Sequence, residues 1–208
     1  MSNNSLRATL LQLAAPAVRA QGLDIWGLEI VDGRQMIVRL YVEAPADAGT
    51  GADAEAAGGE EAGLQPVSPA QLSATVDQCE TISRQFSLAL DAEDVIDRAY
   101  TLEVSTPGFN RIFFSTRQMN EYVGDMVEAR LPSPWSPGEG LPARRTWKGR
   151  LAAVGEDSFT LVPSTIDTDG LVTEEALPPA VIPFERARRV NRIHVFVRPA
   201  KPGKKPKK

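Results

Sequence analysis

Apolar residues recur every three or four positions in two segments, as in helices that bury one face. The apolar positions are Leu6, Leu10, Leu13, Ala17 and Val18 in residues 5–21, and Val76, Cys79, Ile82, Phe86 and Leu90 in the second segment. Ser5 and Thr75 (or an earlier serine) are suitable N-caps, and Gly22 is a suitable stop for the first helix. Pro16 predicts a kink or a fresh helical turn.

Apolar and polar residues alternate in three further segments, which predicts strands with one buried face. Their apolar positions are Trp26, Leu28 and Ile30, then Met36, Val38, Leu40 and Val42, then Tyr100, Leu102 and Val104. Asp32-Gly33 lies between the first two and predicts a tight hairpin turn. The acidic residues 91–97 close the second helix. The order α-β-β-α-β predicts two helices on one face of a three-stranded sheet.

A different pattern follows a short helical segment, Thr116–Tyr122, that ends at Gly124. Beyond it we expect only short strands, at 126–131, 146–154, 158–162, 180–184 and 192–197, with a long turn at 132–143. Five short strands in this space predict a small β-barrel of the SH3 or Sm type. The chain is therefore predicted to be α+β, with an N-terminal α/β domain at residues 1–122 and a barrel domain at 123–198.

Composition changes sharply at two places. Residues 44–63 comprise eight Ala, five Gly, five acidic residues, one Pro and one Thr, which predicts a flexible acidic insertion extending to about residue 74. Residues 184–208 hold ten basic residues and one acidic, a net charge of +9, whereas residues 1–183 carry −13. We expect residues 199–208 to form a disordered basic tail. An acidic body with a basic end can contact RNA, or an RNA-bound partner, with that end.

Several function classes are excluded by the 208-residue composition. One cysteine and one histidine cannot build a disulfide framework or a tetrahedral zinc site, and no apolar run approaches a membrane span. We interpret Cys79 as a core residue and His194 as a solvent-facing strand residue. No phosphate-binding loop is present, and Asp91, Glu93 and Asp94 are interpreted as solvated surface. We therefore expect a cytoplasmic protein that is not an enzyme and needs no cofactor or metal.

The most informative segment is residues 102–111, Leu-Glu-Val-Ser-Thr-Pro-Gly-Phe-Asn-Arg. Pro107 and Gly108 fit the central positions of a type II turn, and Ser105 can hydrogen-bond back to the turn. The local pattern is compatible with nothing more than a strand that ends in a rigid turn. Such a turn would also present Asn110 and Arg111 at the edge of the sheet, as candidates for binding a partner.

This segment resembles the signature strand and turn of the RimP family of bacterial ribosome maturation factors, usually Leu-Glu-Val-Ser-Ser-Pro-Gly-Leu-Asp-Arg. Further similarities follow in order along residues 6–195: Ala15-Pro16, Gly22–Asp24, Asp77–Cys79, Ile82–Arg84, Leu90–Asp94, Trp147–Gly149 and Phe184–Arg188. Thr106, Phe109 and Asn110 depart from the commoner residues. The insertion, the 132–143 turn and the lysine-rich tail are additions to the family pattern.

The resemblance implies a non-enzymatic assembly factor that binds the immature small ribosomal subunit. Family members contact a small-subunit ribosomal protein near the decoding region, so the expected partners are that protein and ribosomal RNA; we expect no membrane partner and a monomer. The partner-binding candidates are Ser105, Pro107, Gly108, Asn110, Arg111, Arg186, Arg188 and Arg189. The alternatives are an Sm-like RNA-binding regulator not dedicated to the ribosome and, less well supported, a carboxylate-based hydrolase.

Overall fold

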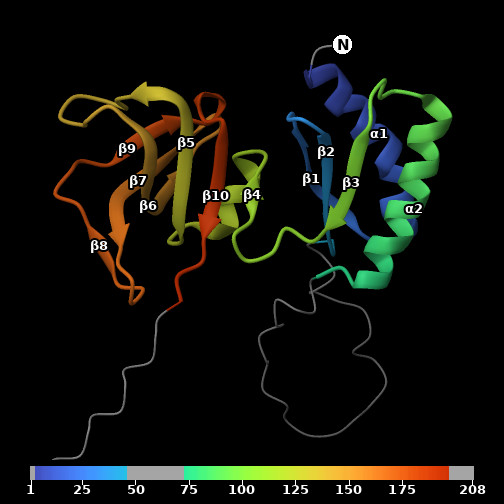
Figure 1. Cartoon of the computed structure of the whole chain (residues 1–208). Coiled ribbons are helices and arrows are strands. Elements are labelled where there is room, and N and C mark those ends of the chain that lie inside the picture. The colour runs from blue at the N-terminus through green and yellow to red at the C-terminus, as the bar shows by residue number, and fades with distance from the viewer. Residues whose placement is uncertain (1–2, 46–72, 197–208) are drawn as a thin grey trace, which may run out of the picture. The chain divides into compact units, whose positions relative to one another are not determined.

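The computed structural model describes residues 3–45 and 73–196 (Figure 1). The chain divides into two compact units, Met1–Pro107 and Gly108–Lys208. This division lies earlier than the boundary expected at residue 122, because the strand at Ile112–Phe113 pairs with a strand near the C-terminus. The acidic insertion and the basic tail fall mostly or wholly outside the described residues.

Unit 1 has the predicted element order: α1 (Asn3–Ala20), β1 (Asp24–Val31), β2 (Met36–Glu43), α2 (Val76–Glu93) and β3 (Tyr100–Ser105). The sheet order is β1-β2-β3, in which β1 and β2 are antiparallel and β2 and β3 are parallel. Both helices lie on the same side of this sheet, as Figure 1 shows. The segment that includes α2 is the crossover that a parallel strand pair requires.

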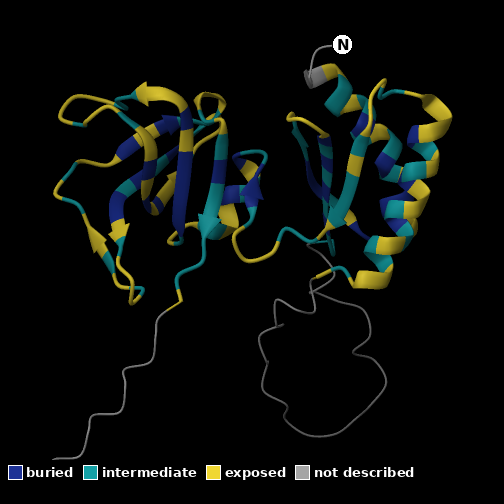
Figure 2. Ribbon diagram, viewed as in Figure 1, coloured by how far each residue is buried: buried dark blue, intermediate teal, exposed yellow. Residues whose placement is uncertain are grey.

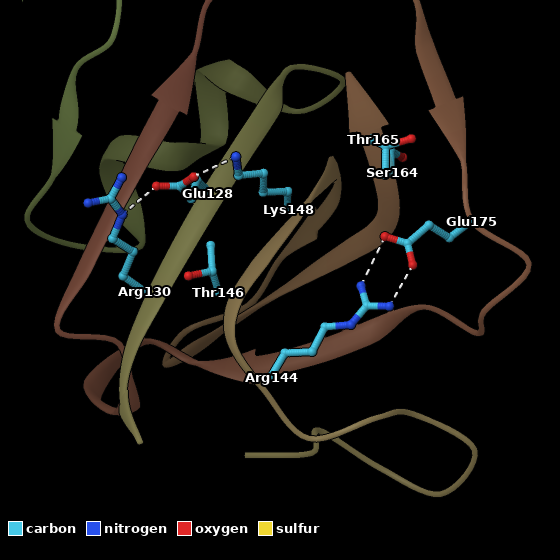
Figure 3. Close-up of a pocket in the computed structure, with 8 residues that line it drawn as sticks. All are labelled: Glu128, Arg130, Arg144, Thr146, Lys148, Ser164, Thr165 and Glu175. Atoms are coloured by element: carbon cyan, nitrogen blue, oxygen red, sulfur yellow. Dashed lines mark hydrogen bonds and ion pairs between the residues drawn. The ribbon is translucent and has the colours of Figure 1, made fainter. Parts of the chain in front are cut away.

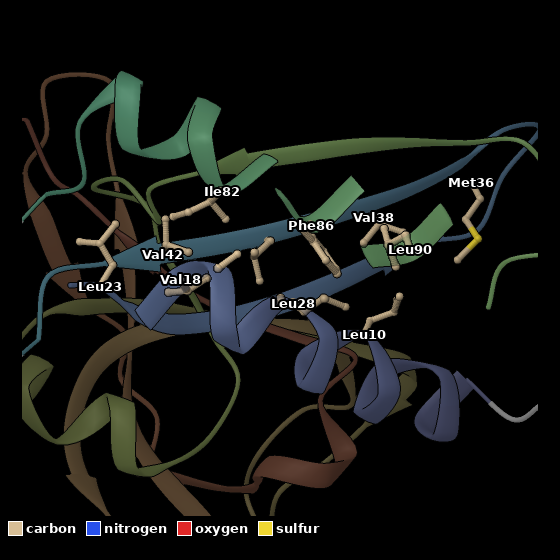
Figure 4. Close-up of a cluster of buried hydrophobic side chains, with 13 residues drawn as sticks. Leu10, Val18, Leu23, Leu28, Met36, Val38, Val42, Ile82, Phe86 and Leu90 are labelled. Carbon is tan, nitrogen blue, oxygen red and sulfur yellow. The ribbon is translucent and has the colours of Figure 1, made fainter. Parts of the chain in front are cut away.

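The core of unit 1 fills the space between the helices and the sheet (Figure 4). All four apolar residues predicted for β2 are buried, as are Leu10 and Val18 of α1 and Ile82, Phe86 and Leu90 of α2. Cys79 packs against this core, and burial raises the pKa of its thiol. Val76 is 81% exposed, so its predicted place on the buried face is wrong.

The helix ends are set by local capping. Thr75 caps α2 through a capping box, in which its side chain accepts from the Gln78 N–H and the Gln78 side chain accepts from the Thr75 N–H. Gly22 has φ +67° just after α1, as expected for its stop. Pro16 lies inside α1, which continues to Ala20. Because α1 begins at Asn3, Ser5 lies within the helix and is not its N-cap.

Unit 2 is built mainly of antiparallel strands and two short 3-10 helices. The elements are β4 (Ile112–Phe113), η2 (Arg117–Tyr122), β5 (Met126–Trp135), β6 (Arg144–Val154), β7 (Ser158–Ile166), β8 (Val172–Glu174), β9 (Ala180–Pro183), η3 (Phe184–Arg186) and β10 (Arg189–Ile193). They form a seven-stranded sheet of order β4-β10-β5-β6-β7-β8, with β9 also paired to β7. In the described chain this order does not close into a barrel.

The five strands predicted for unit 2 are all present, with different ends. β5 continues to Trp135, which pairs with Arg144, so the turn expected at 132–143 begins later. β10 starts at Arg189 and ends at Ile193, before the predicted 192–197 segment ends. Buried residues, dark blue in Figure 2, lie mainly on the strands of this unit and include Trp147, Phe159 and Leu161. Trp147 is completely buried.

Candidate functional site

The segment 105–111 joins the two units. β3 ends at Ser105, Pro107 is the last residue of unit 1, and Gly108 is the first of unit 2. Gly108 has φ +67°, the conformation expected at the third position of a type II turn. A Cβ at this position would meet nothing within 4 Å, so the backbone conformation, and not lack of space, favours glycine.

Asn110 and Arg111 fasten this turn to unit 2. The Asn110 Oδ1 atom accepts from the backbone N–H of His194 at 2.7 Å, and the Arg111 carbonyl accepts from the N–H of Arg192 at 2.9 Å. The Arg111 Nε–H donates to the Gly108 carbonyl at 3.3 Å. Arg111 is half-buried, and its guanidinium group contacts the Gly108 carbonyl and the Tyr122 hydroxyl within the unit; its role in binding a partner stays a prediction.

Tyr122, at the end of η2, has two guanidinium groups close to its ring. The Arg111 and Arg192 Cζ atoms lie 5.3 and 5.1 Å from the ring centroid, and the Tyr122 hydroxyl accepts from Arg111 Nη1. Arg192 also pairs with Asp125, with 2.7 Å between Nε and Oδ2. These cation–π and ionic contacts hold the turn, η2 and β10 together. The sequence analysis did not select Tyr122, because its partners are ten or more residues away along the chain.

Three aromatic side chains form a connected group beside this cluster. The His194 ring centroid lies 5.2 Å from that of Phe109 and 4.5 Å from that of Phe196. Phe109 and Phe196 are 57% and 69% exposed. His194 is half-buried and lies after β10, so its interpretation as a solvent-facing strand residue is wrong. We call Phe109, His194 and Phe196 the aromatic platform.

The basic candidates near the C-terminus have different environments. Arg186 and Arg188 are exposed and Arg189 is half-buried. The Arg186 Cζ atom lies 4.9 Å from the Trp135 ring centroid, and the Arg188 N–H donates to the Arg130 carbonyl at 2.8 Å. Only the first two therefore place a guanidinium on an exposed surface.

A second polar site lies on β5, β6 and β7 and encloses a pocket of about 530 Å³ (Figure 3). Its carboxylate Glu128 is buried and pairs with Arg130 at 2.5 Å and Lys148 at 3.1 Å. Burial opposes ionisation of Glu128, but hydrogen bonds and charge interactions with these two cations outweigh it and lower its pKa. The sequence analysis did not select this carboxylate. The signal available in the sequence was a charged residue between two apolar residues, Val127 and Ala129, in a predicted strand.

The far side of the same pocket is held by Arg144 and Glu175. The two side chains form a bidentate ion pair, with N–O distances of 2.9 and 2.8 Å. The hydrogen bond from Arg144 lowers the pKa of Glu175. Arg144 also lies over the buried Trp147 ring, at 5.3 Å from Cζ to the centroid. The pocket is thus lined by three cations, two carboxylates and the hydroxyls of Thr146, Ser164 and Thr165.

Within residues 3–45 and 73–196, no group of three or more His, Cys, Asp and Glu side chains is arranged to hold a metal ion. In the same ranges, no helix combines the length and apolar character needed to span a membrane.

Comparison with known proteins places this arrangement in a family. Residues 13–110 match the model of the RimP N-terminal domain. A ribosome maturation factor RimP from Desulfovibrio desulfuricans is 44% identical, covering 98% of this chain and 86% of the relative. Two from Nitratidesulfovibrio vulgaris are 37% identical (strain Miyazaki F; 98% of this chain, 89% of the relative) and 36% identical (strain DP4; all of both chains). The chain therefore belongs to the RimP family of ribosome maturation factors.

Proposed function

We propose that this protein is a non-enzymatic factor for maturation of the small ribosomal subunit, acting in the cytoplasm as a monomer. It binds the immature subunit through a small-subunit ribosomal protein, ribosomal RNA or both. The observation that carries the proposal is the 44% identity to a ribosome maturation factor over nearly the whole chain. Unit 2 is proposed to be an SH3- or Sm-like module, supported by the β5-β6-β7 order and by the single-turn η3 before the last strand.

The charges of the two units support contact with both kinds of partner. Residues 1–107 contain six basic and sixteen acidic residues, a net charge of −10. Residues 108–208 contain seventeen basic and eleven acidic residues, a net charge of +6. An acidic unit favours a basic ribosomal protein, and a basic unit favours the phosphates of RNA.

We propose two separate sets of contact residues: residues 105–111, and the arginines of η3 and of the segment after it. Ser105, Gly108 and Asn110 are exposed, and Pro107 and Arg111 hold the turn in place. Arg186 and Arg188 supply the exposed charge, and Arg189 lies beside them at the start of β10.

Sucrose-gradient sedimentation of the tagged protein from cell lysate tests the proposal. We expect it to migrate with free small subunits and to be absent from complete ribosomes. Migration with complete ribosomes, or away from small subunits altogether, would overturn the proposal. Binding to RNA that is not ribosomal would instead support the Sm-like regulator.

Charge reversal tests the second of these sets in the same gradient. The double variant Arg186→Glu, Arg188→Glu is expected to lower the fraction that migrates with small subunits. Arg117→Glu is the matched control, because Arg117 is an exposed arginine of the same unit in η2. Equal loss in both variants would mean that the contact is not local to η3.

A further inference from the structure

Two phenylalanine rings of the aromatic platform face solvent, although large apolar side chains are usually buried. Phe109 and Phe196 are more than half exposed, and the rings of both lie close to the ring of His194. An exposed group of connected rings offers flat π-surfaces to a ligand, and such surfaces are typical of binding sites.

Hydrogen bonds hold the backbone next to two of the three rings, Phe109 and His194. Asn110 binds the backbone of His194, and the Arg111 carbonyl binds the backbone of Arg192. The Arg111 side chain returns to the Gly108 carbonyl, so the turn that carries Phe109 is fixed as well. Because the backbone beside Phe109 and His194 is positioned in advance, a ligand that stacks on these rings has a smaller ordering cost to overcome.

An exposed cation lies near the platform. His194 also lines a pocket of about 260 Å³ with Arg150, Arg192 and Asp125; Arg192 pairs with Asp125, whereas the half-exposed Arg150 lies 3.8 Å from Glu174. The twelve residues that follow Phe196 in the sequence contain six basic and no acidic residues. Exposed rings next to cations match a strand with unpaired bases and phosphates, whereas an apolar peptide would not need the cations.

We propose that the aromatic platform stacks unpaired bases of single-stranded RNA, while neighbouring cations contact the phosphates. This inference rests on the proposed function, which makes immature ribosomal RNA the available strand. The inference adds a way of recognising RNA. Because any base can stack on an aromatic ring, the platform selects unpaired strands and does not select a sequence.

Fluorescence anisotropy with a labelled single-stranded oligoadenylate of about ten nucleotides measures the binding directly. The test variant is Phe109→Leu, Phe196→Leu, which keeps the apolar bulk and removes both rings. Loss of one stacked base lowers affinity at least about five-fold, so the double variant is expected to bind at least that much more weakly. The dependence on salt should stay the same, because the rings carry no charge.

Two controls isolate the rings. Phe109→Tyr, Phe196→Tyr keeps both π-surfaces and is expected to bind within about two-fold of the wild type. Leu171→Ala removes an apolar side chain that is 65% exposed in the same unit and is expected to change nothing. All three proteins should unfold at the wild-type denaturant midpoint, since the changed side chains are exposed.

The outcomes separate this inference from the function on which it rests. Wild-type affinity in the leucine variant would overturn the platform, and so would an equal loss in Leu171→Ala. If the leucine variant bound oligoadenylate normally but no longer migrated with small subunits, the platform would contact protein, and the RNA inference would be wrong. If the wild type itself did not migrate with small subunits, the proposed function would fail, whatever the oligonucleotide result.

Discussion

At the residue scale, Gly108 shows how one backbone angle selects the amino acid at a position. At φ +67° an L-residue with a Cβ is strained, while the space around the position is open. Gly108→Ala is therefore expected to lower the free energy of unfolding by about 1–2 kcal/mol, measured by urea denaturation.

Gly138→Ala is the matched control for this effect. Gly138 also has nothing within 4 Å of a built Cβ, but its φ lies outside the left-handed region. The substitution should leave stability unchanged or raise it slightly, because alanine restricts the unfolded chain. Equal losses at the two positions would show that strain at Gly108 is not the cause.

Glu128 should make stability depend on pH. Its pKa is lowered in the folded protein, so the folded state favours the carboxylate. This contribution is complete above the pKa of the unfolded chain, about 4.3, and is lost as the pH falls through the lower folded value. Glu128→Gln is expected to cost about 1–3 kcal/mol at pH 7 and progressively less below about pH 4.3.

Glu174→Gln serves as the comparison for Glu128. Glu174 is 56% exposed and lies 3.8 Å from Arg150, so its ion pair is screened by water. Its removal should change stability little, with no marked trend between pH 3 and pH 7, about the range in which carboxylates titrate. A similar pH trend in both variants would point to net charge and not to the buried pair.

Single residues were predicted well from the sequence where local geometry decides their role. Gly22, Gly108 and Thr75 follow from the demands of a helix stop, a turn and a cap. His194 was misinterpreted, and the contacts of Arg111 were not predicted, because the surroundings of both residues come from distant parts of the sequence. Neither the stacking on Phe109 nor the contact with Tyr122 leaves a periodic signal.

At the scale of elements, the pairing of β6 with β7 requires a glycine at position 149. A Cβ on Gly149 would lie 2.2 Å from the Val162 carbonyl oxygen and 2.8 Å from its carbon. These are backbone atoms of the paired strand and cannot move without breaking the pairing. Gly149→Ala should therefore destabilise the protein by about 3 kcal/mol or more in urea denaturation.

Gly155→Ala provides the comparison within the same hairpin. There the nearest atoms to a Cβ, from Ser158, lie at 3.3 Å, so a small shift relieves the contact. The loss should be clearly smaller than for Gly149→Ala. If Gly149→Ala lowered the stability no more than Gly155→Ala does, then β6 and β7 would separate locally more easily than their pairing indicates.

Elements with a long periodic pattern were predictable, and short ones were not. β2 buries every second residue and α2 carries a cap and an apolar face, so both are encoded locally. β4 and β8 have two and three residues, too few to show alternation, and exist because β10 and β7 pair with them. A β-bulge also affects which residues of a strand point to the same face. The bulge between Ile25 and Gly27 interrupts the alternation expected for β1.

For the whole molecule, the order of the units could be taken from the apolar pattern, and the acidic body with its basic C-terminal end from the composition, but the binding surfaces could not. The aromatic platform and the Glu128 pocket each combine residues from separate strands or turns. Only the pairing of those segments brings them together. The resemblance in residues 102–111 identified the family because the motif is continuous in sequence.

The basic residues 201–208 should contribute to RNA binding through charge alone. Five lysines and no acidic residue lie there. Each phosphate neutralised on a single strand adds about 0.7 to the slope of log K against log salt, so truncation after Ala200 should reduce that slope by up to about three or four.

Selection of immature small subunits should survive this truncation, because charge contacts position a protein on RNA without choosing among sites. Affinities of full-length and truncated protein at three salt concentrations give the two slopes. Parallel lines would mean that the lysines only aid solubility, as chain ends tolerate such additions. Loss of the preference for small subunits over other RNA would place specificity in residues 201–208, and the folded units would then not be the source of selection.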